Sequence, residues 1–92
     1  MIQSFRDADT RILYETGSTK RWAAIKAVAL RKLDQVDNAT SLGDLCSPPG
    51  NRLEALRGDR RGLHSIRIND QFRMCFEWKP DGAHNVEITD YH

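Results

Sequence analysis

The spacing of the apolar residues changes once along this chain, near residue 50. Before that point, apolar residues recur at helical spacing: Trp22, Ile25, Ala29, Leu33 and Val36. After it, three stretches alternate apolar and polar residues as half-buried strands do: 63–69, 72–78 and 84–89. Short links between consecutive strands favour antiparallel pairing. The pattern predicts an α+β domain in which two N-terminal helices pack on one face of a mostly antiparallel sheet.

The first half of the chain is expected to hold one short strand and two helices. Residues 2–5 are predicted to form the strand, and residues 6–17 a helix that ends at Gly17. The long helix is predicted over residues 18–39, with Ser18 or Thr19 capping its start. A helical turn at residues 41–45 and a break at the prolines and glycine of 46–51 complete this half.

The second half is expected to form the sheet. Residues 52–57 are predicted to form a strand with Leu53 and also Ala55 inward, and residues 58–62 and 79–82 to form turns. In the stretch 72–78, one face carries Phe72, Met74, Phe76 and Trp78, and the other carries Arg73, Cys75 and Glu77. The helices must cover the apolar face, so we expect the face with the arginines to look outward.

Length and composition narrow the class of protein. A chain of 92 residues predicts one domain, over residues 1–92. It lacks the roughly 20 consecutive apolar residues of a membrane span, and its first residues lack the apolar core of a signal peptide, so we expect no membrane partner and a cytoplasmic location. Cys46 and Cys75 form no CxxC motif, and the three histidines show no ligand spacing. We therefore predict no metal site and no cofactor.

Arginine is concentrated in one segment of an almost neutral chain. Residues 52–73 hold six arginines against three acidic residues, while the net charge of the whole chain is +1. Such a local excess is typical of a surface that binds an anionic partner. It is also compatible with a solvated sheet edge that discourages pairing between edges. Charge alone leaves both interpretations open.

The last three residues, Asp90, Tyr91 and His92, directly continue the final predicted strand. The imidazole of His92 titrates near neutrality, so it can give or take a proton. Tyr91 can donate a hydrogen bond or stack on a base, and Asp90 can orient an imidazole or an arginine. Together with the guanidinium groups of Arg73 and Arg57, which match phosphate geometry, these groups suit RNA cleavage without metal. The alternative is an inert polar strand end on an RNA-binding domain.

Three motifs in this order resemble the HigB branch of the RelE-like toxins. They are the opening "MIQSF", the central "L…L.GDR.G…I.IN..FR..F.W" and the terminal "V.I.DYH", and together they cover nearly the whole chain. The resemblance implies a RelE-like fold and a bacterial toxin that cleaves mRNA in the A site of the 70S ribosome. It also implies neutralisation by a HigA-like helix-turn-helix antitoxin.

The resemblance assigns roles to particular residues. It implies that Arg73 and the terminal Asp90, Tyr91 and His92 are catalytic. It also implies a set of RNA-binding residues: Arg57, Arg60, Arg67 and Gln71. Some relatives carry a histidine where this chain has Glu54, and a carboxylate there can act as a base or pair with an arginine. The general base therefore stays unassigned.

Two other functions are compatible with parts of the sequence. ParE-like relatives share the fold but poison DNA gyrase, and the terminal "DYH" argues against that branch. A plain RNA- or protein-binding module with an inert tail is the other alternative.

Overall fold

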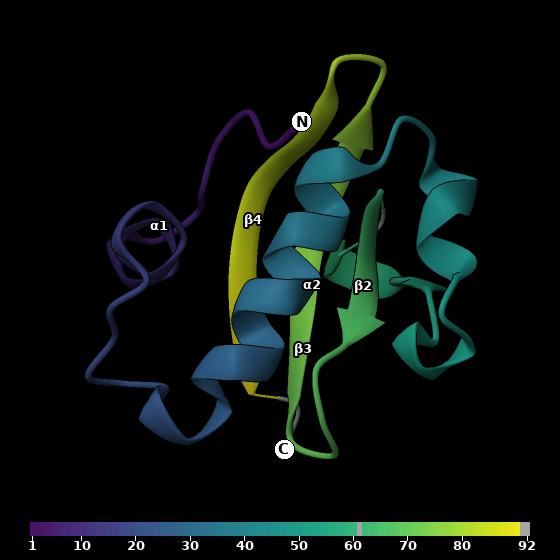
Figure 1. Cartoon of the computed structure of the whole chain (residues 1–92). Coiled ribbons are helices and arrows are strands. Elements are labelled where there is room, and N and C mark those ends of the chain that lie inside the picture. The colour runs from purple at the N-terminus through teal and green to yellow at the C-terminus, as the bar shows by residue number, and fades with distance from the viewer. Residues whose placement is uncertain (61, 91–92) are drawn as a thin grey trace.

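The computed structural model describes residues 1–60 and 62–90 of the chain, with the side chain of Arg60 also outside the description. The helices are α1 (Ala8–Thr16) and α2 (Lys26–Asn38). The strands are β1 (Glu54–Ala55), β2 (Leu63–Arg67), β3 (Phe72–Lys79) and β4 (Gly82–Asp90). They form one sheet of order β1-β2-β3-β4, and every neighbouring pair is antiparallel (Figure 1). The α+β prediction is confirmed.

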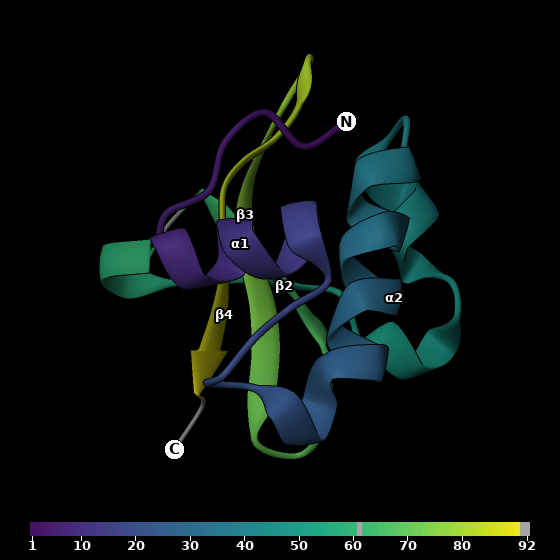
Figure 2. The same ribbon diagram turned by 60° about the vertical axis from the view of Figure 1, so that its left-hand side comes forward.

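Both helices lie on the same face of the sheet, which Figures 1 and 2 show from two sides. The core fills the space between these two layers. Its fully buried large side chains come from the helices, the strands and the turn after α2: Leu13, Leu33, Val36, Leu45, Ile66, Met74, Phe76 and Val86. Phe72 and Trp78 pack against this core from the ends of β3. The predicted apolar face of residues 72–78 is therefore the face that the helices cover.

Helix α1 has the ends that its sequence predicts. The Asp7 carboxylate accepts hydrogen bonds from the backbone N–H and the hydroxyl of Thr10, at 3.0 and 2.7 Å. At the other end, Gly17 adopts the left-handed conformation (φ 72°) and its N–H donates to the Leu13 carbonyl. The buried Thr10 hydroxyl accepts from Ile88 N at 3.3 Å, so this cap also joins α1 to β4.

We expect Asp7→Ala to lower the free energy of unfolding by about 1 to 2 kcal/mol, because an N-cap carboxylate and its bond to Thr10 are both lost. Urea unfolding followed by circular dichroism measures the change. Asp9→Ala is the matched control, since Asp9 lies in the same turn and pairs with the exposed Arg21. Equal effects of the two substitutions would contradict the cap.

Helix α2 begins later than its sequence predicts. The expected start near residue 18 is wrong: residues 23–25 form a 3₁₀ turn, and α2 begins at Lys26. Thr19 does not cap α2. Its hydroxyl accepts a hydrogen bond from Trp22 N and so caps the turn of residues 19–22, which precedes α2. Trp22 is buried in the core. The turns at residues 19–25 redirect the chain as it crosses from α1 to α2, and this lets the Trp22 ring enter the core.

Residues 2–5 do not form a full strand. They make two isolated parallel bridges to β4, at Ile2–Ala83 and Phe5–Val86, with Gln3 N 2.7 Å from the Ala83 carbonyl oxygen. The approach is so close that a Cβ atom on Gly82, whose φ is 129°, would lie 2.0 Å from the Met1 carbonyl oxygen. The N-terminal segment therefore covers the outer edge of β4.

Strand β1 is shorter than predicted. It spans only Glu54 and Ala55, and both are exposed, so the inward placement of Ala55 is wrong. The chain turns away at once, and Leu56 N donates to the Leu63 carbonyl to close the connection to β2.

Among the helices in the described part of the chain, none is long and apolar enough to cross a bilayer.

Candidate functional site

The sheet face opposite the helices is polar, and the strand register shows which residues share it. Arg67 on β2 lies opposite Arg73 on β3, and Glu54 on β1 lies opposite Ser65 on β2. Paired residues of antiparallel strands point to the same face. We call this surface the arginine face: Glu54, Ser65, Arg67, Arg73 and Thr89.

Arg73 is buried at the centre of the arginine face. Only 7% of the residue is accessible, whereas the sequence predicted an outward-facing arginine. Its Nε donates to the Ser65 hydroxyl at 2.7 Å, and its Nη2 donates to the Arg52 carbonyl at 2.7 Å and to the Ser65 carbonyl at 3.2 Å. The neighbouring Cys75 is also covered, at 3% accessible. The prediction of a fully open face is therefore wrong at its centre, because the chain around Arg52 folds against it.

These bonds hold the Arg73 guanidinium in one place. Arg52 contributes its carbonyl from a left-handed conformation (φ 46°), which turns that oxygen toward the sheet. A guanidinium fixed in this way is a preorganised positive charge, and such charges stabilise anions more strongly than mobile ones.

Glu54 is near this charge. Its Oε2 lies 3.9 Å from Arg73 Nη2, and its side chain is 46% accessible. Of the two roles that the sequence left open, the ion pair is present in the structure, at the limit of contact distance. Proton transfer by the same carboxylate stays a hypothesis.

We expect Glu54→Gln to change the free energy of unfolding by less than about 1 kcal/mol, because a half-exposed ion pair contributes little. Thermal or urea unfolding measures this. The same variant separates the two roles of Glu54 in RNA cleavage. A loss of rate near 10²-fold or more, with one limb of the pH profile gone, would identify it as the base.

Arg67 lies beside Arg73 but is engaged differently. Its guanidinium pairs with Asp70 in the turn between β2 and β3, and the Asp70 side chain is 99% accessible. The hydrogen bond and the charge of Arg67 lower the pKa of Asp70 below its usual value. Arg67 is therefore held at the solvent boundary, where a stronger anion can compete for it.

The turn between β2 and β3 positions two further candidates. Asn69 Oδ1 accepts from the backbone N–H groups of Gln71 and Phe72, at 2.8 and 2.7 Å, which fixes the turn. The Gln71 amide then donates to Asp90 Oδ2 at 3.0 Å. The structure thus brings Gln71 and Asp90 together at one end of the sheet.

The strand register places the side chains of Asp90 and Arg73 on opposite faces of the sheet. Asp90 lies opposite Phe72, which packs toward the helices, and Arg73 lies opposite Thr89. The two residues are close in the sheet but belong to opposite faces.

The remaining predicted residues are placed only in part. Arg57 is exposed in the connection after β1, and Arg60 ends the 3₁₀ turn Gly58–Arg60. The side chain of Arg60, and the whole of Tyr91 and His92, lie outside the described residues. Their proposed roles stay predictions.

Sequence reasoning missed three residues that build this site: Arg52, Ser65 and Asn69. Ser65 could have been predicted from the sequence, since strand alternation puts it on the same face as Arg67. The sequence "IND" is typical of an Asx turn and signalled Asn69. No local signal marks Arg52, because its role depends on a carbonyl oxygen in contact with a residue 21 positions away.

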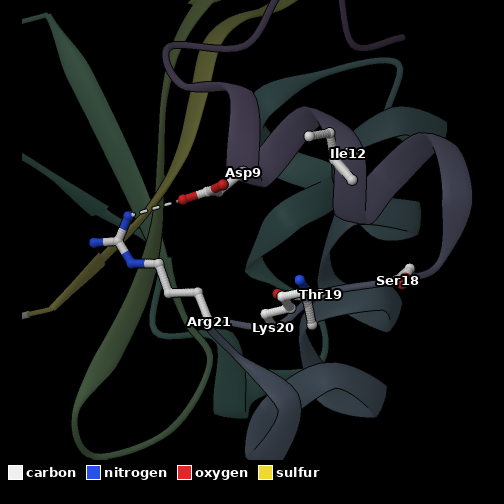
Figure 3. Close-up of a pocket in the computed structure, with 6 residues that line it drawn as sticks. All are labelled: Asp9, Ile12, Ser18, Thr19, Lys20 and Arg21. Carbon is white, nitrogen blue, oxygen red and sulfur yellow. Dashed lines mark hydrogen bonds and ion pairs between the residues drawn. The ribbon is translucent and has the colours of Figure 1, made fainter.

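Two hollows in the described part of the chain are lined by other residues. One, of about 390 Å³, is lined by Asp59, Cys75, Glu77 and Glu87 among others. The other, of about 500 Å³, lies between α1 and residues 18–21 (Figure 3). Figure 3 shows Asp9 and Arg21 facing each other there, with Arg21 Nη1 3.4 Å from Asp9 Oδ2. Neither hollow contains a predicted site residue.

The fold and the arginine face define a small α+β domain with a polar, arginine-containing sheet face, and comparison with known proteins gives its class. Residues 3–92 match a family described as the RelE-like toxin HigB of type II toxin–antitoxin systems. The chain is 39% identical over 93 residues to Toxin HigB-1 of Vibrio cholerae, which covers 99% of this chain and 98% of that protein. It is 31% identical to Endoribonuclease HigB of Proteus vulgaris, over the full length of both.

The chain belongs to the HigB-like family of RelE-like toxins. A toxin of a type II toxin–antitoxin system has an antitoxin as its partner. An uncharacterized protein of Haemophilus influenzae is 33% identical over 97% of this chain and 90% of its own length.

Proposed function

We propose that this protein is an endoribonuclease that arrests translation by cutting mRNA in the A site of the 70S ribosome. The reaction needs no metal ion: the 2′-hydroxyl attacks the adjacent phosphorus, a cyclic phosphate forms, and the bond to the 5′-oxygen breaks. The antitoxin that neutralises the protein is HigA-like with a helix-turn-helix motif, and both act in the cytoplasm, where the ribosomes are.

One observation carries the proposal: two arginines, Arg67 and Arg73, face the same side of the sheet on paired strands, beside the end of β4. Arg73 is fixed by hydrogen bonds to Ser65 and Arg52, and Arg67 pairs with an exposed carboxylate. Guanidinium groups so placed suit a phosphate and the extra charge of its transition state. The name of the Proteus vulgaris relative supports the same class of reaction.

In this mechanism the chain supplies charge and proton transfer. Arg73 stabilises the charge that develops on the phosphorane, and Arg57, Arg60 and Arg67 bind neighbouring phosphates. His92 and its neighbours carry the proton from the 2′-oxygen or to the 5′-oxygen. Gln71, whose amide donates to Asp90, contacts a base edge in this proposal.

Ribosome dependence follows from the size of the site. A domain of 92 residues has few groups with which to bend an RNA strand into line for attack. A ribosome that already holds the codon in a fixed, kinked path supplies that geometry.

The test uses purified chain and 70S ribosomes carrying a defined mRNA. With the A site vacant, we expect a cut within the A-site codon, mapped by primer extension. With the A site filled by tRNA, or with the same mRNA free in solution, we expect no cut. Efficient cutting of free mRNA would reject ribosome dependence. DNA damage after expression, with transcripts intact, would favour the gyrase alternative.

A further inference from the structure

Arg52 has a backbone conformation that residues other than glycine seldom adopt, with φ 46° and ψ 56°. This conformation turns its carbonyl oxygen toward Arg73, whose Nη2 donates to that oxygen at 2.7 Å. A residue in a strained conformation persists only where its surroundings hold it there. The residues that hold Arg52 therefore also influence the orientation of the Arg73 guanidinium.

The carbonyl of Arg52 differs in origin from the other acceptors that Arg73 uses. The hydroxyl and the carbonyl of Ser65 belong to β2, which pairs directly with β3. Their positions are therefore set by the sheet itself. Arg52 precedes β1 and lies outside the sheet, so the place of its carbonyl depends on the contacts of the segment before it. This segment can change the direction of Arg73 Nη2 while the sheet stays intact.

The residue next to Arg52, Asn51, fixes that segment. Asn51 is fully buried, and its Nδ2 donates to the Leu45 carbonyl at 3.2 Å and to the Ser47 carbonyl at 3.3 Å. The N–H of Arg52 donates to the Pro49 carbonyl at 3.2 Å and closes the 3₁₀ turn before it. The buried amide of Asn51 thus anchors the turn from which Arg52 extends.

Two side chains of α2 complete the surroundings of Asn51. Lys32 Nζ donates to the Asn51 side-chain oxygen, and Asn51 Nδ2 donates to Gln35 Oε1 at 2.9 Å. Lys32 and Gln35 are three residues apart, so they share one face of the helix. Figure 1 shows the chain between α2 and β1 on the side of the sheet away from β4. Asn51 therefore links the helix layer to the arginine face, around the edge of the sheet.

We propose that Asn51 is a positioning residue for cleavage: its buried amide holds the Arg52 carbonyl, and that oxygen orients the Arg73 guanidinium toward the phosphate. The inference rests on the proposed function, since it names a residue that acts on the cleavage site through Arg73. Asn51 touches neither RNA nor the reacting atoms.

The first test is Asn51→Asp, which keeps the size of the side chain but replaces its N–H donor with an acceptor oxygen. That oxygen faces the carbonyls of Leu45 and Ser47. We expect the cleavage rate at saturating 70S ribosomes to fall about tenfold or more, because misplacing a catalytic group by about 1 Å can cost 10²-fold. KM should change less than about twofold, because Asn51 makes no contact with the substrate.

A nuclear magnetic resonance measurement follows Arg73 without any cleavage. The Nε–H of Arg73 is hydrogen-bonded to Ser65, so its exchange with solvent should be slow in the intact chain. Exchange should be faster in Asn51→Asp, because the guanidinium is no longer held at Nη2. Loss of the signal in Arg73→Lys assigns it.

A second pair of variants tests the backbone of Arg52 itself. Arg52→Gly and Arg52→Val both remove the guanidinium of this residue, but only valine disfavours the left-handed conformation. The cleavage rate of Arg52→Val should therefore be about tenfold below that of Arg52→Gly, with faster exchange at Arg73 Nε. This pair decides the matter if Asn51→Asp does not fold.

Asn85 provides the matched control. It is an exposed residue of β4 that also adopts the left-handed conformation, with φ 54°, and it belongs to no part of the proposed site. Asn85→Val introduces the same strain as Arg52→Val, and Asn85→Gly relieves it. The two Asn85 variants should cut A-site mRNA at the same rate. Circular dichroism confirms that each variant is folded.

The outcomes distinguish this proposal from the proposed function. Unchanged exchange at Arg73 Nε in both Asn51→Asp and Arg52→Val overturns the positioning role, even if the intact chain cuts A-site mRNA. Faster exchange with an unchanged cleavage rate, or a change in KM alone, overturns it as well. An equal difference in rate between the two Asn85 variants also overturns it, since strain at any site would then suffice. Faster exchange in variants of a chain that cuts no mRNA supports the link from Asn51 to Arg73 and rejects the proposed nuclease.

Discussion

Removing Asp90, Tyr91 and His92, or replacing His92 with alanine, is expected to abolish transcript cleavage and growth arrest while the domain stays folded. A positioned acid or base contributes about 10²- to 10⁴-fold, so His92→Ala alone should lower the rate by that range. The fold should persist because the core lies between the helices and the strands, and β3 and β4 stay paired as far as Thr89. Mapping 5′ ends of cellular transcripts after expression measures the effect.

His84→Ala is the matched control for His92→Ala. His84 lies near the hairpin between β3 and β4, where its Nε2 pairs with Asp81 at 2.7 Å, and it belongs to no part of the proposed site. It should leave cleavage unchanged. A chain without its last three residues that still cut transcripts at the normal rate would remove the chemical basis of the proposal.

Arg73→Ala is expected to lower the free energy of unfolding by about 3 kcal/mol and to reduce cleavage by about 10²- to 10³-fold. The stability loss follows because the Ser65 hydroxyl and the Arg52 carbonyl lose a buried donor, and each unsatisfied group costs about 1 to 3 kcal/mol. The loss of rate follows because a fixed charge near the phosphate is removed. Urea unfolding and ribosome-programmed cleavage measure the two effects.

Two variants separate the structural role of Arg73 from its role in cleavage. Ser65→Ala removes one acceptor and keeps the guanidinium, so it should cost stability but little activity. Arg67→Ala removes a neighbouring charge from an exposed pair, so it should cost activity and under about 1 kcal/mol of stability. An Arg73→Ala protein as stable as the intact chain would contradict the buried network.

The sheet was predictable because its signals are local. Alternation placed Met74 and Phe76 in the core and Arg67 and Arg73 on the opposite face, and the register agrees. The end of α1 at Gly17 was predictable for the same reason, since a left-handed residue after a helix favours glycine.

The start of α2 and the burial of Arg73 were not predictable. The alanine-rich run from Ala23 to Ala29 has high helix propensity, which hides the turn that burial of Trp22 requires. Arg73 is buried because a carbonyl oxygen from Arg52 and a hydroxyl from Ser65 meet it in the folded chain. Such long-range partners leave no pattern in the sequence around residue 73.

The bridges between residues 2–5 and β4 bear on how the protein is made. Gln3 contacts Asp81, and Thr10 contacts Ile88, across sequence separations of 78 residues in both cases. Contacts between residues so far apart in the sequence form late in folding, because a long loop must close first. A nascent chain that has emerged only as far as β3 cannot complete them. Strand β4 leads into the proposed catalytic residues, and it also makes the contacts that complete the fold. The toxin can therefore fold and act only after the ribosome that makes it has translated past β4.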